Sequence, residues 1–246
     1  MDQALQTPEI LTRILTFMHN DSVSSSRNPL TPLARVNSTW REIVQSIIWA
    51  APPVEALAGI ERSRRDLFAP YIRNLDFGGT RDPTLHTLFV DLHFGRLRKL
   101  TLSNPPIEYT NRQSPGVLDG WNLTASQYLQ PTLVDLQLLR WDSICTASFF
   151  KQIADRCPRL KRIFFSGVGA QLRPDEFLSF LEACRHLEAV ELNLGSDFTS
   201  SILITADLLL HLSRKPKLDY LELSNSLDQP ELFQIIRDQN PTLSRA

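Results

Sequence analysis

Apolar residues recur along most of the chain in one phrase, leucine-x-x-leucine-x-leucine. Clear copies begin at Leu97, Leu133, Leu160, Leu187 and Leu218, and degenerate copies begin at Ile72 and Leu243. From the copy at Ile72 to the copy at Leu218, successive copies start 25 to 36 residues apart. Alternating apolar positions bury one face of a short strand and leave the residues between them on the other face. A single strand cannot bury such a face alone, so the copies are predicted to stack.

Amphipathic helices are predicted between the strands. Apolar residues at i, i+3 and i+4 spacing mark residues 148–157, 174–184, 205–213 and 230–238. Proline stands shortly before several copies of the phrase, as at Pro131, Pro158 and Pro216. A proline at that place ends the preceding helix and favours an extended chain. Each unit is therefore predicted to be a strand, a turn and a helix.

The first fifty residues follow a different pattern. A helix is predicted from Thr7, with Pro8 at its first position and with Leu11, Ile14, Leu15 and Met18 on one face. Two further helices are predicted to begin at Thr31-Pro32 and at Asn37-Ser38, and the polar residues 20–28 are predicted to form a loop. Three short helices are too small to support a domain easily, so we expect this module to use a partner.

The repeated unit resembles the leucine-rich repeats of adaptor proteins, in which proline or cysteine precedes the strand. The resemblance covers residues 54–246, with an irregular insertion at about 104–130. It implies an α/β solenoid with a parallel sheet on its concave face, preceded by a three-helix module over residues 1–53.

The N-terminal module resembles an F-box of the fungal type. The resemblance rests on Leu5-x-x-Pro8-Glu9-Ile10-Leu11-x-x-Ile14-Leu15 and, after a loop, on Leu33-Ala34-x-Val36-x-x-x-Trp40. The loop is longer than usual, and Asn37 stands where many F-boxes carry cysteine or serine. By this resemblance, the residues that bind a Skp-type adaptor are Pro8, Ile10, Leu11, Ile14, Leu15, Leu33, Val36 and Trp40.

An F-box followed by leucine-rich repeats implies the substrate receptor of a Skp–cullin–F-box ubiquitin ligase. Such a receptor performs no chemistry itself and contributes proximity between a protein substrate and the ubiquitin-conjugating enzyme. The alternative is a stand-alone leucine-rich-repeat scaffold in which the N-terminal helices only cap the repeats. A repeat-based hydrolase is disfavoured, because the sequence has no nucleophile elbow, Walker loop or dinucleotide-binding glycine pattern.

Strand alternation predicts which residues face outward from the sheet and bind the substrate. These residues are Asn74, Asp76, Lys99, Thr101, Asp135, Gln137, Leu139, Arg162, Phe164, Ala189, Glu191, Tyr220 and Glu222. Leu139, Arg162, Phe164 and Tyr220 form the predicted centre, and Glu191 and Glu222 favour a partner with basic residues. Two alternatives stay open: a register slipped by one residue would bury Phe164, and the insertion, with Tyr109 and Trp121, could instead carry recognition.

Composition narrows the partners. The 246 residues carry a formal net charge of −1, which favours neither nucleic acid nor an anionic membrane. No run of about 18 apolar residues and no signal-peptide pattern is visible, so we expect a cytoplasmic or nuclear protein, or one found in both places.

No cofactor or metal is expected. His86, Asp91 and His93 form the single local cluster that could suggest a metal, and they lack the usual helical spacing. Cys157 and Cys184, at equivalent places in two units, are predicted to be buried packing residues. The basic run 61–65 is predicted to be a solvated helix face.

Overall fold

The computed structural model describes residues 7–21, 29–80, 83–103, 125–139, 147–166, 173–193, 206–215 and 217–224. Contacts divide the chain into two compact units. The first comprises Met1–Leu75 and Asp91–Arg96, and the second comprises Asp76–Val90 and Leu97–Ala246. The predicted module 1–53 falls within the first unit. The predicted helix 230–238, together with Tyr109 and Trp121, lies outside the described residues.

Within the described residues, the first unit contains the three predicted N-terminal helices and three more. Its helices are α1 (Pro8–Asp21), η2 (Thr31–Arg35), α2 (Ser38–Ile48), α3 (Val54–Ala58), α4 (Arg62–Phe68) and η3 (Ala69–Tyr71). The side chain of Asn37 caps α2, because its Oδ1 accepts a hydrogen bond from the backbone N–H of Trp40 at 2.9 Å. The predicted helix after Thr31-Pro32 is a single 3-10 segment, η2. The three helix openings indicated by the sequence are confirmed.

Only part of the apolar face of α1 is buried in the module's own core. Leu11 and Leu15 are buried with Leu30 and Val44. Ile14 and Met18, predicted on the same face, remain 42% and 38% exposed, so only part of that face is buried. Successive residues turn about 100° around a helix, so Ile14 points well away from Leu15. The neighbouring helices are too few to cover that whole arc.

The helix α4 of the same unit holds a buried arginine. Arg65 is 8% exposed and donates hydrogen bonds to the backbone oxygens of Ala58 at 2.8 Å and Ile60 at 3.0 Å. Arg62 and Arg64 are exposed, and Arg62 pairs with Asp91 at 2.7 Å. The prediction of a solvated face therefore holds for these two residues and is wrong for Arg65, whose guanidinium satisfies carbonyl groups in the turn between α3 and α4.

Six strands form one open sheet whose order follows the chain, β1-β2-β3-β4-β5-β6. The strands are β1 (Asn74–Asp76), β2 (Lys99–Ser103), β3 (Asp135–Leu139), β4 (Arg162–Ser166), β5 (Ala189–Asn193) and β6 (Tyr220–Ser224). The pairs from β2 to β6 are parallel and in step, so Lys99, Asp135, Arg162, Ala189 and Tyr220 lie in one row across the sheet. The fold is thus α/β with a parallel, unclosed sheet.

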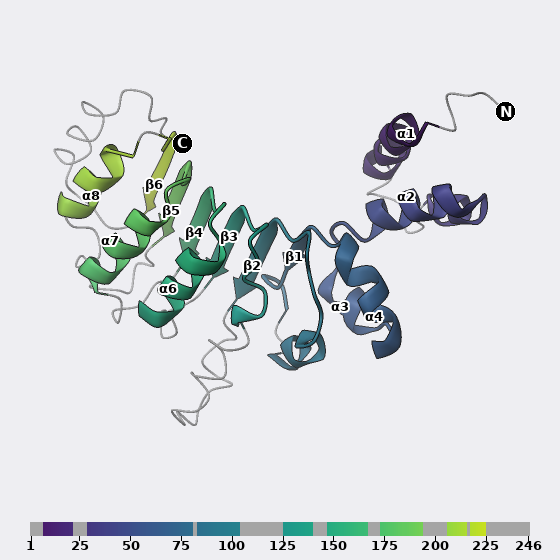
Figure 1. Cartoon of the computed structure of the whole chain (residues 1–246), viewed down its shortest axis with the longest axis horizontal. Helices are drawn as coiled ribbons and strands as arrows, with labels where there is room; N and C mark the ends of the chain where they lie inside the picture. Colours follow the sequence, from purple (N-terminus) through teal and green to yellow (C-terminus); the bar gives the residue numbers. More distant parts are fainter. Residues whose placement is uncertain are drawn as a thin grey trace. The chain divides into compact units, whose positions relative to one another are not determined.

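Helices follow β1, β3, β4 and β5 in the described residues, and they pack along one face of the sheet (Figure 1). They are α6 (Ala147–Arg156), α7 (Pro174–Ala183) and α8 (Ala206–Ser213), and η4 (Pro83–Phe89) follows β1. Phe150 of α6 and Phe177 of α7 contact Phe165 of β4 edge-on, with ring centroids 5.6 Å and 5.7 Å apart. The predicted helices 148–157, 174–184 and 205–213 are confirmed within one residue at each end.

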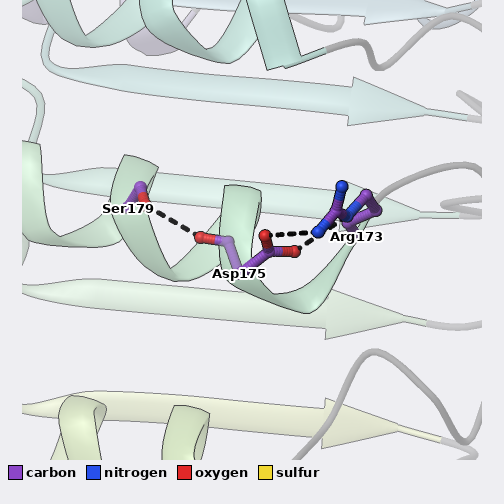
Figure 2. A network of polar contacts seen from close by, with 3 residues as sticks. All are labelled: Arg173, Asp175 and Ser179. Atoms are coloured by element: carbon purple, nitrogen blue, oxygen red, sulfur yellow. Dashed lines mark hydrogen bonds and ion pairs between the residues drawn. The ribbon is translucent and has the colours of Figure 1, made fainter.

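The start of α7 shows why its sequence favours a helix there. Pro174 occupies the first turn, and Arg173 Nε and Nη2 donate to the two carboxylate oxygens of Asp175 at 3.1 Å and 2.8 Å (Figure 2). The hydroxyl of Ser179 donates to the backbone oxygen of Asp175 at 2.8 Å. Asp175 also places a negative charge at the positive end of the helix dipole. These exposed contacts define the helix start, and the buried aromatic rings hold it to the sheet.

Candidate functional site

An apolar stripe runs along the outer side of α1 in the first unit. It consists of Ile10, Ile14, Phe17 and Met18, which are 42%, 42%, 67% and 38% exposed. Their i, i+4, i+7 and i+8 spacing places them on one side of the helix. Val36, just after η2, is also 49% exposed. Exposed apolar side chains gathered in this way are typical of a surface that binds another protein.

The eight predicted adaptor-binding residues divide into two groups in this unit. Pro8, Ile10, Ile14 and Val36 are exposed and can contact a partner. Leu33 and Trp40 are half-buried, and Leu11 and Leu15 are buried and hold the helices together. Phe17, the most exposed large apolar residue described, was missed, although its position seven residues after Ile10 could have indicated it.

The second candidate surface is the outer face of the sheet in the second unit. Residues one, three and five of each strand from β2 to β6 form three rows on this face. The middle row consists of Thr101, Gln137, Phe164, Glu191 and Glu222. Residues two and four are apolar and face the helices, as the alternating burial of β3 and β4 shows.

The register around Phe164 matches the predicted alternation. Ile163 and Phe165 are 1% and 0% exposed, whereas Phe164 between them is half-buried. Phe164 pairs with Gln137 of β3 and with Glu191 of β5. The alternative of a register slipped by one residue, with Phe164 in the core, is therefore wrong.

Two residues lie on the outer face as predicted but are buried there. Thr101 is 4% exposed, because the turn after β1 passes close to it: a Cβ on Gly78 would lie 3.3 Å from Thr101 Cγ2 and 3.1 Å from Leu139 Cδ1. Ala189 is 8% exposed, since its short side chain lies between the longer side chains of Arg162 and Tyr220. Among the described residues of this face, the exposed ones are Asn74 and Asp76 of β1, Arg162 of β4 and Glu222 of β6.

Charges alternate along the first row of this face. Lys99 Nζ lies 3.9 Å from the carboxylate of Asp135, and Arg162 is the next residue in the row. Burial raises the pKa of the Asp135 carboxyl, while Lys99 and Arg162 act in the opposite direction. From β2 to β4 this row therefore holds two positive charges and one negative charge.

Negative charge is concentrated at the other end of the middle row. Glu191 and Glu222 are directly paired on β5 and β6. Burial, followed by the charges of Glu222 and Asp135, raises the pKa of the Glu191 carboxyl, while the charges of Arg162 and Lys99 act in the opposite direction. Tyr220 donates its hydroxyl proton to Glu222 Oε2 at 2.6 Å, and this hydrogen bond is the main reason that the pKa of Tyr220 is raised to about 12.

The structure brings five of the six predicted substrate-binding residues together on β4, β5 and β6. These are Arg162, Phe164, Glu191, Tyr220 and Glu222. Leu139 lies one strand away on β3, is half-buried and adjoins Gly78. The grouping follows from the in-step pairing of the strands, which places residues distant in sequence in adjacent positions.

The histidine and the two cysteines considered for metal binding or redox chemistry are buried among packed side chains. His86 is 2% exposed, stacks on Phe77 with 4.2 Å between ring centroids, and has its Nδ1 3.2 Å from the hydroxyl oxygen of Tyr128. Cys157 and Cys184 are buried free thiols, and burial raises the pKa of each to about 12. The described residues contain no group of three or more histidine, cysteine or carboxylate side chains able to hold a metal ion. None of the described helices is long and apolar enough to cross a membrane.

No protein-family model matches this sequence, and no curated protein matches it either.

Proposed function

We propose that this chain is the substrate-recognition subunit of a Skp–cullin–F-box ubiquitin ligase. In this proposal the helices of residues 1–53 form an F-box that docks on a Skp-type adaptor and, through it, on a cullin. The strand and helix units form a leucine-rich-repeat solenoid whose sheet face binds a protein substrate in the cytoplasm or nucleus. The chain supplies proximity to the ubiquitin-conjugating enzyme and no catalytic group.

The observation that carries the adaptor-binding role is the exposed stripe on α1. One side of α1 is used internally, because Leu11 and Leu15 are 1% exposed in the module's own core. The other side presents Ile10, Ile14 and Phe17 to solvent, and an internal cap would not need apolar residues there. Burying such side chains at an interface stabilises a complex by about 25 cal/mol for each Å² of apolar surface removed from water. A second helical protein surface of matching apolar character is the partner that this stripe fits.

The arrangement of the second unit supports the leucine-rich-repeat part of the proposal. Successive strands from β2 to β6 pair without any shift in register, although the connecting segments differ in length. Each repeat buries its leucines, or the apolar residues that replace them, between the sheet and one helix layer, as stacked repeats require. A regular sheet of this kind leaves one face for recognition.

Replacing Ile14 and Phe17 together by alanine tests the adaptor-binding role. Both side chains are exposed, so the double variant should stay folded and should bind a purified Skp-type adaptor at least about tenfold more weakly. Binding is measured by calorimetry, and folding is measured by circular dichroism and thermal melting. Leu11→Ala is a poor probe, because truncating a buried leucine costs about 2 to 5 kcal/mol of stability.

Leu67→Ala is the matched control, since Leu67 is 64% exposed on α4 of the same unit and lies outside the stripe. It should bind the adaptor as the original chain does. Equal affinity of the original chain and the folded double variant would contradict the assignment of this stripe. A complete failure of the original chain to bind would favour the stand-alone scaffold, with the helices serving only as a cap.

A further inference from the structure

The outer face of the sheet carries two neighbouring carboxylates that lack a cationic partner within the described residues. Lys99 pairs with Asp135, and Lys161 Nζ lies 2.6 Å from Glu188 Oε1. No lysine, arginine or histidine of the described ranges lies within 4 Å of the carboxylates of Glu191 or Glu222. Two like charges held side by side repel each other, and a cation supplied by a partner would relieve that repulsion.

The distance between the two carboxylates follows from the sheet. Glu191 and Glu222 are directly paired on adjacent parallel strands, and such strands lie about 4.8 Å apart. One cationic group can therefore reach both side chains at once. Tyr220 donates to Glu222 at 2.6 Å and restrains it, so less side-chain freedom is lost when a ligand binds.

An aromatic side chain lies beside these carboxylates. Phe164 pairs with Glu191 on the side opposite Glu222, so one row runs from an aromatic ring to two carboxylates across three strands. An aromatic face next to carboxylates suits a guanidinium group, which stacks on rings and hydrogen-bonds carboxylates in a bidentate manner. A metal ion would gain nothing from Phe164, and a phosphate would be repelled by the carboxylates.

The neighbouring residues limit what lies next to the cation. Arg162, two residues before Phe164 on β4, is exposed and disfavours a second basic residue toward that side. Leu139, half-buried on β3, offers an apolar contact further across the face. The face thus has two neighbouring carboxylates on β5 and β6, whereas β3 and β4 carry Asp135 beside Arg162 and the apolar Leu139 and Phe164.

We propose that this face binds an extended substrate segment through an arginine side chain, which lies between Glu191 and Glu222 and against Phe164, with an apolar residue toward Leu139. The segment is part of the substrate in the proposed ligase, so this inference rests on the proposed function for its biological role. Its chemistry is stated for the sheet face alone. Lysine fits the same place with fewer contacts, because it cannot bond both carboxylates in a planar fork.

A selection from a random 12-residue displayed peptide library on the full chain tests the inference. Peptides selected on the original chain should be enriched in arginine with an apolar residue nearby. The double variant Glu191→Gln and Glu222→Gln should lose this enrichment. The control Asp155→Asn with Asp207→Asn removes two carboxylates from exposed helix positions and should keep it.

The strongest selected peptide then gives a test that leaves the protein unchanged. Replacing its arginine by citrulline, which has nearly the same shape and no charge, should weaken binding by about tenfold or more in fluorescence anisotropy. The lysine version should fall between the two.

The contribution of the aromatic ring is tested in the protein itself. Phe164→Leu should weaken binding of the arginine peptide by about threefold, since the aromatic face is lost and the apolar contact is kept.

The proposal is overturned if no peptide is selected, if selected peptides lack arginine, or if citrulline binds as well as arginine. Adaptor binding by the double glutamine variant separates this inference from the proposed function. If the chain and its variants bind the adaptor normally but none of them selects arginine peptides, the ligase role stands and the peptide site is ruled out. A chain that selects arginine peptides and never binds adaptor retains the site and loses the ligase role.

Discussion

At the scale of single residues, position decides the role of chemically similar side chains. Phe165 is buried against the helices, while Phe164 beside it is half-buried on the outer face. Leu11 belongs to the core around α1, while Ile14 three residues later is 42% exposed. In the strand the alternation of two predicts this outcome. In the helix, the outcome depends on how wide an arc the neighbouring helices cover.

His86 is predicted to make the protein less stable in weak acid. Burial lowers the pKa of His86 from 6.5 to about 4, because the charged imidazolium is disfavoured in its surroundings of Phe77 and Tyr128. In the unfolded chain His86 therefore takes up a proton near pH 6.5, whereas in the folded chain it takes up this proton only near pH 4. The contribution of neutral His86 is complete above pH 6.5, declines as the pH falls, and is lost at about pH 4.

Between pH 6.5 and pH 4, protonation of His86 should lower the free energy of unfolding by about 3 kcal/mol. Urea unfolding at several pH values measures it. His86→Phe keeps the stacking on Phe77 and cannot titrate, so this variant should lose less stability on acidification. It should also be about 1 kcal/mol less stable at pH 7, since the hydrogen bond with the Tyr128 hydroxyl is gone. An identical pH profile in both proteins would rule out His86 as the source.

At the scale of elements, aromatic residues hold the helix layer to the sheet. Phe150 of α6 lies within 4.8 to 5.8 Å, centroid to centroid, of the rings of Phe165 in β4 and of Phe177 and Phe180 in α7. This one ring therefore joins three elements, α6, β4 and α7, from two successive repeats. Edge-on and tilted contacts of this kind add to the stabilisation from burial alone.

Truncating this ring should be among the most destabilising single changes in the second unit. Phe150 is 1% exposed, and Phe150→Ala should lower the free energy of unfolding by about 3 to 5 kcal/mol, because a cavity remains among the surrounding rings. Chemical denaturation followed by circular dichroism measures the change. Leu88→Ala serves as the comparison, since Leu88 is 42% exposed in the same unit and should cost much less. Similar losses for both variants would contradict the central role given to Phe150.

At the scale of the whole molecule, the sheet order gives most strands only two neighbours. Each of the strands β2 to β5 pairs with the strands immediately before and after it in sequence, and the sheet does not close. Stability in such an array depends on contacts between neighbouring units. The strands within the array therefore receive support from two sides, and β1 and β6 at the ends of the described sheet receive less.

Hydrogen exchange should report this gradient. Backbone amides of β3, β4 and β5 are expected to exchange more slowly than those of β1 and β6, because opening an inner strand breaks two sets of ladder hydrogen bonds. Exchange followed by mass spectrometry or NMR measures the protection of each strand. Equal protection in all six strands would show that the sheet opens only as one cooperative unit. Phe150→Ala should lower protection first in β4, which contacts this ring through Phe165.

The sequence alone determined the local structure and the face to which each strand residue belongs. Asn37, Pro8 and Pro174 indicated where helices begin, because capping and proline geometry act within one turn. Alternating leucines indicated the buried and outer rows, since successive strand residues point to opposite faces. The adjacency of Glu191 and Glu222 also followed once the copies of the phrase were aligned.

Only the tertiary structure decided what covers each face. Thr101 is buried because Gly78, in the turn after β1, approaches it, and no local pattern announces that approach. Arg65 is buried because the carbonyl groups of Ala58 and Ile60 accept hydrogen bonds from its guanidinium, although its charge favours solvent. Ile14 is exposed because none of the described helices covers that side of α1. Periodicity sets the direction of a side chain through local backbone geometry, whereas burial depends on distant segments whose approach is governed by the packing of the whole unit.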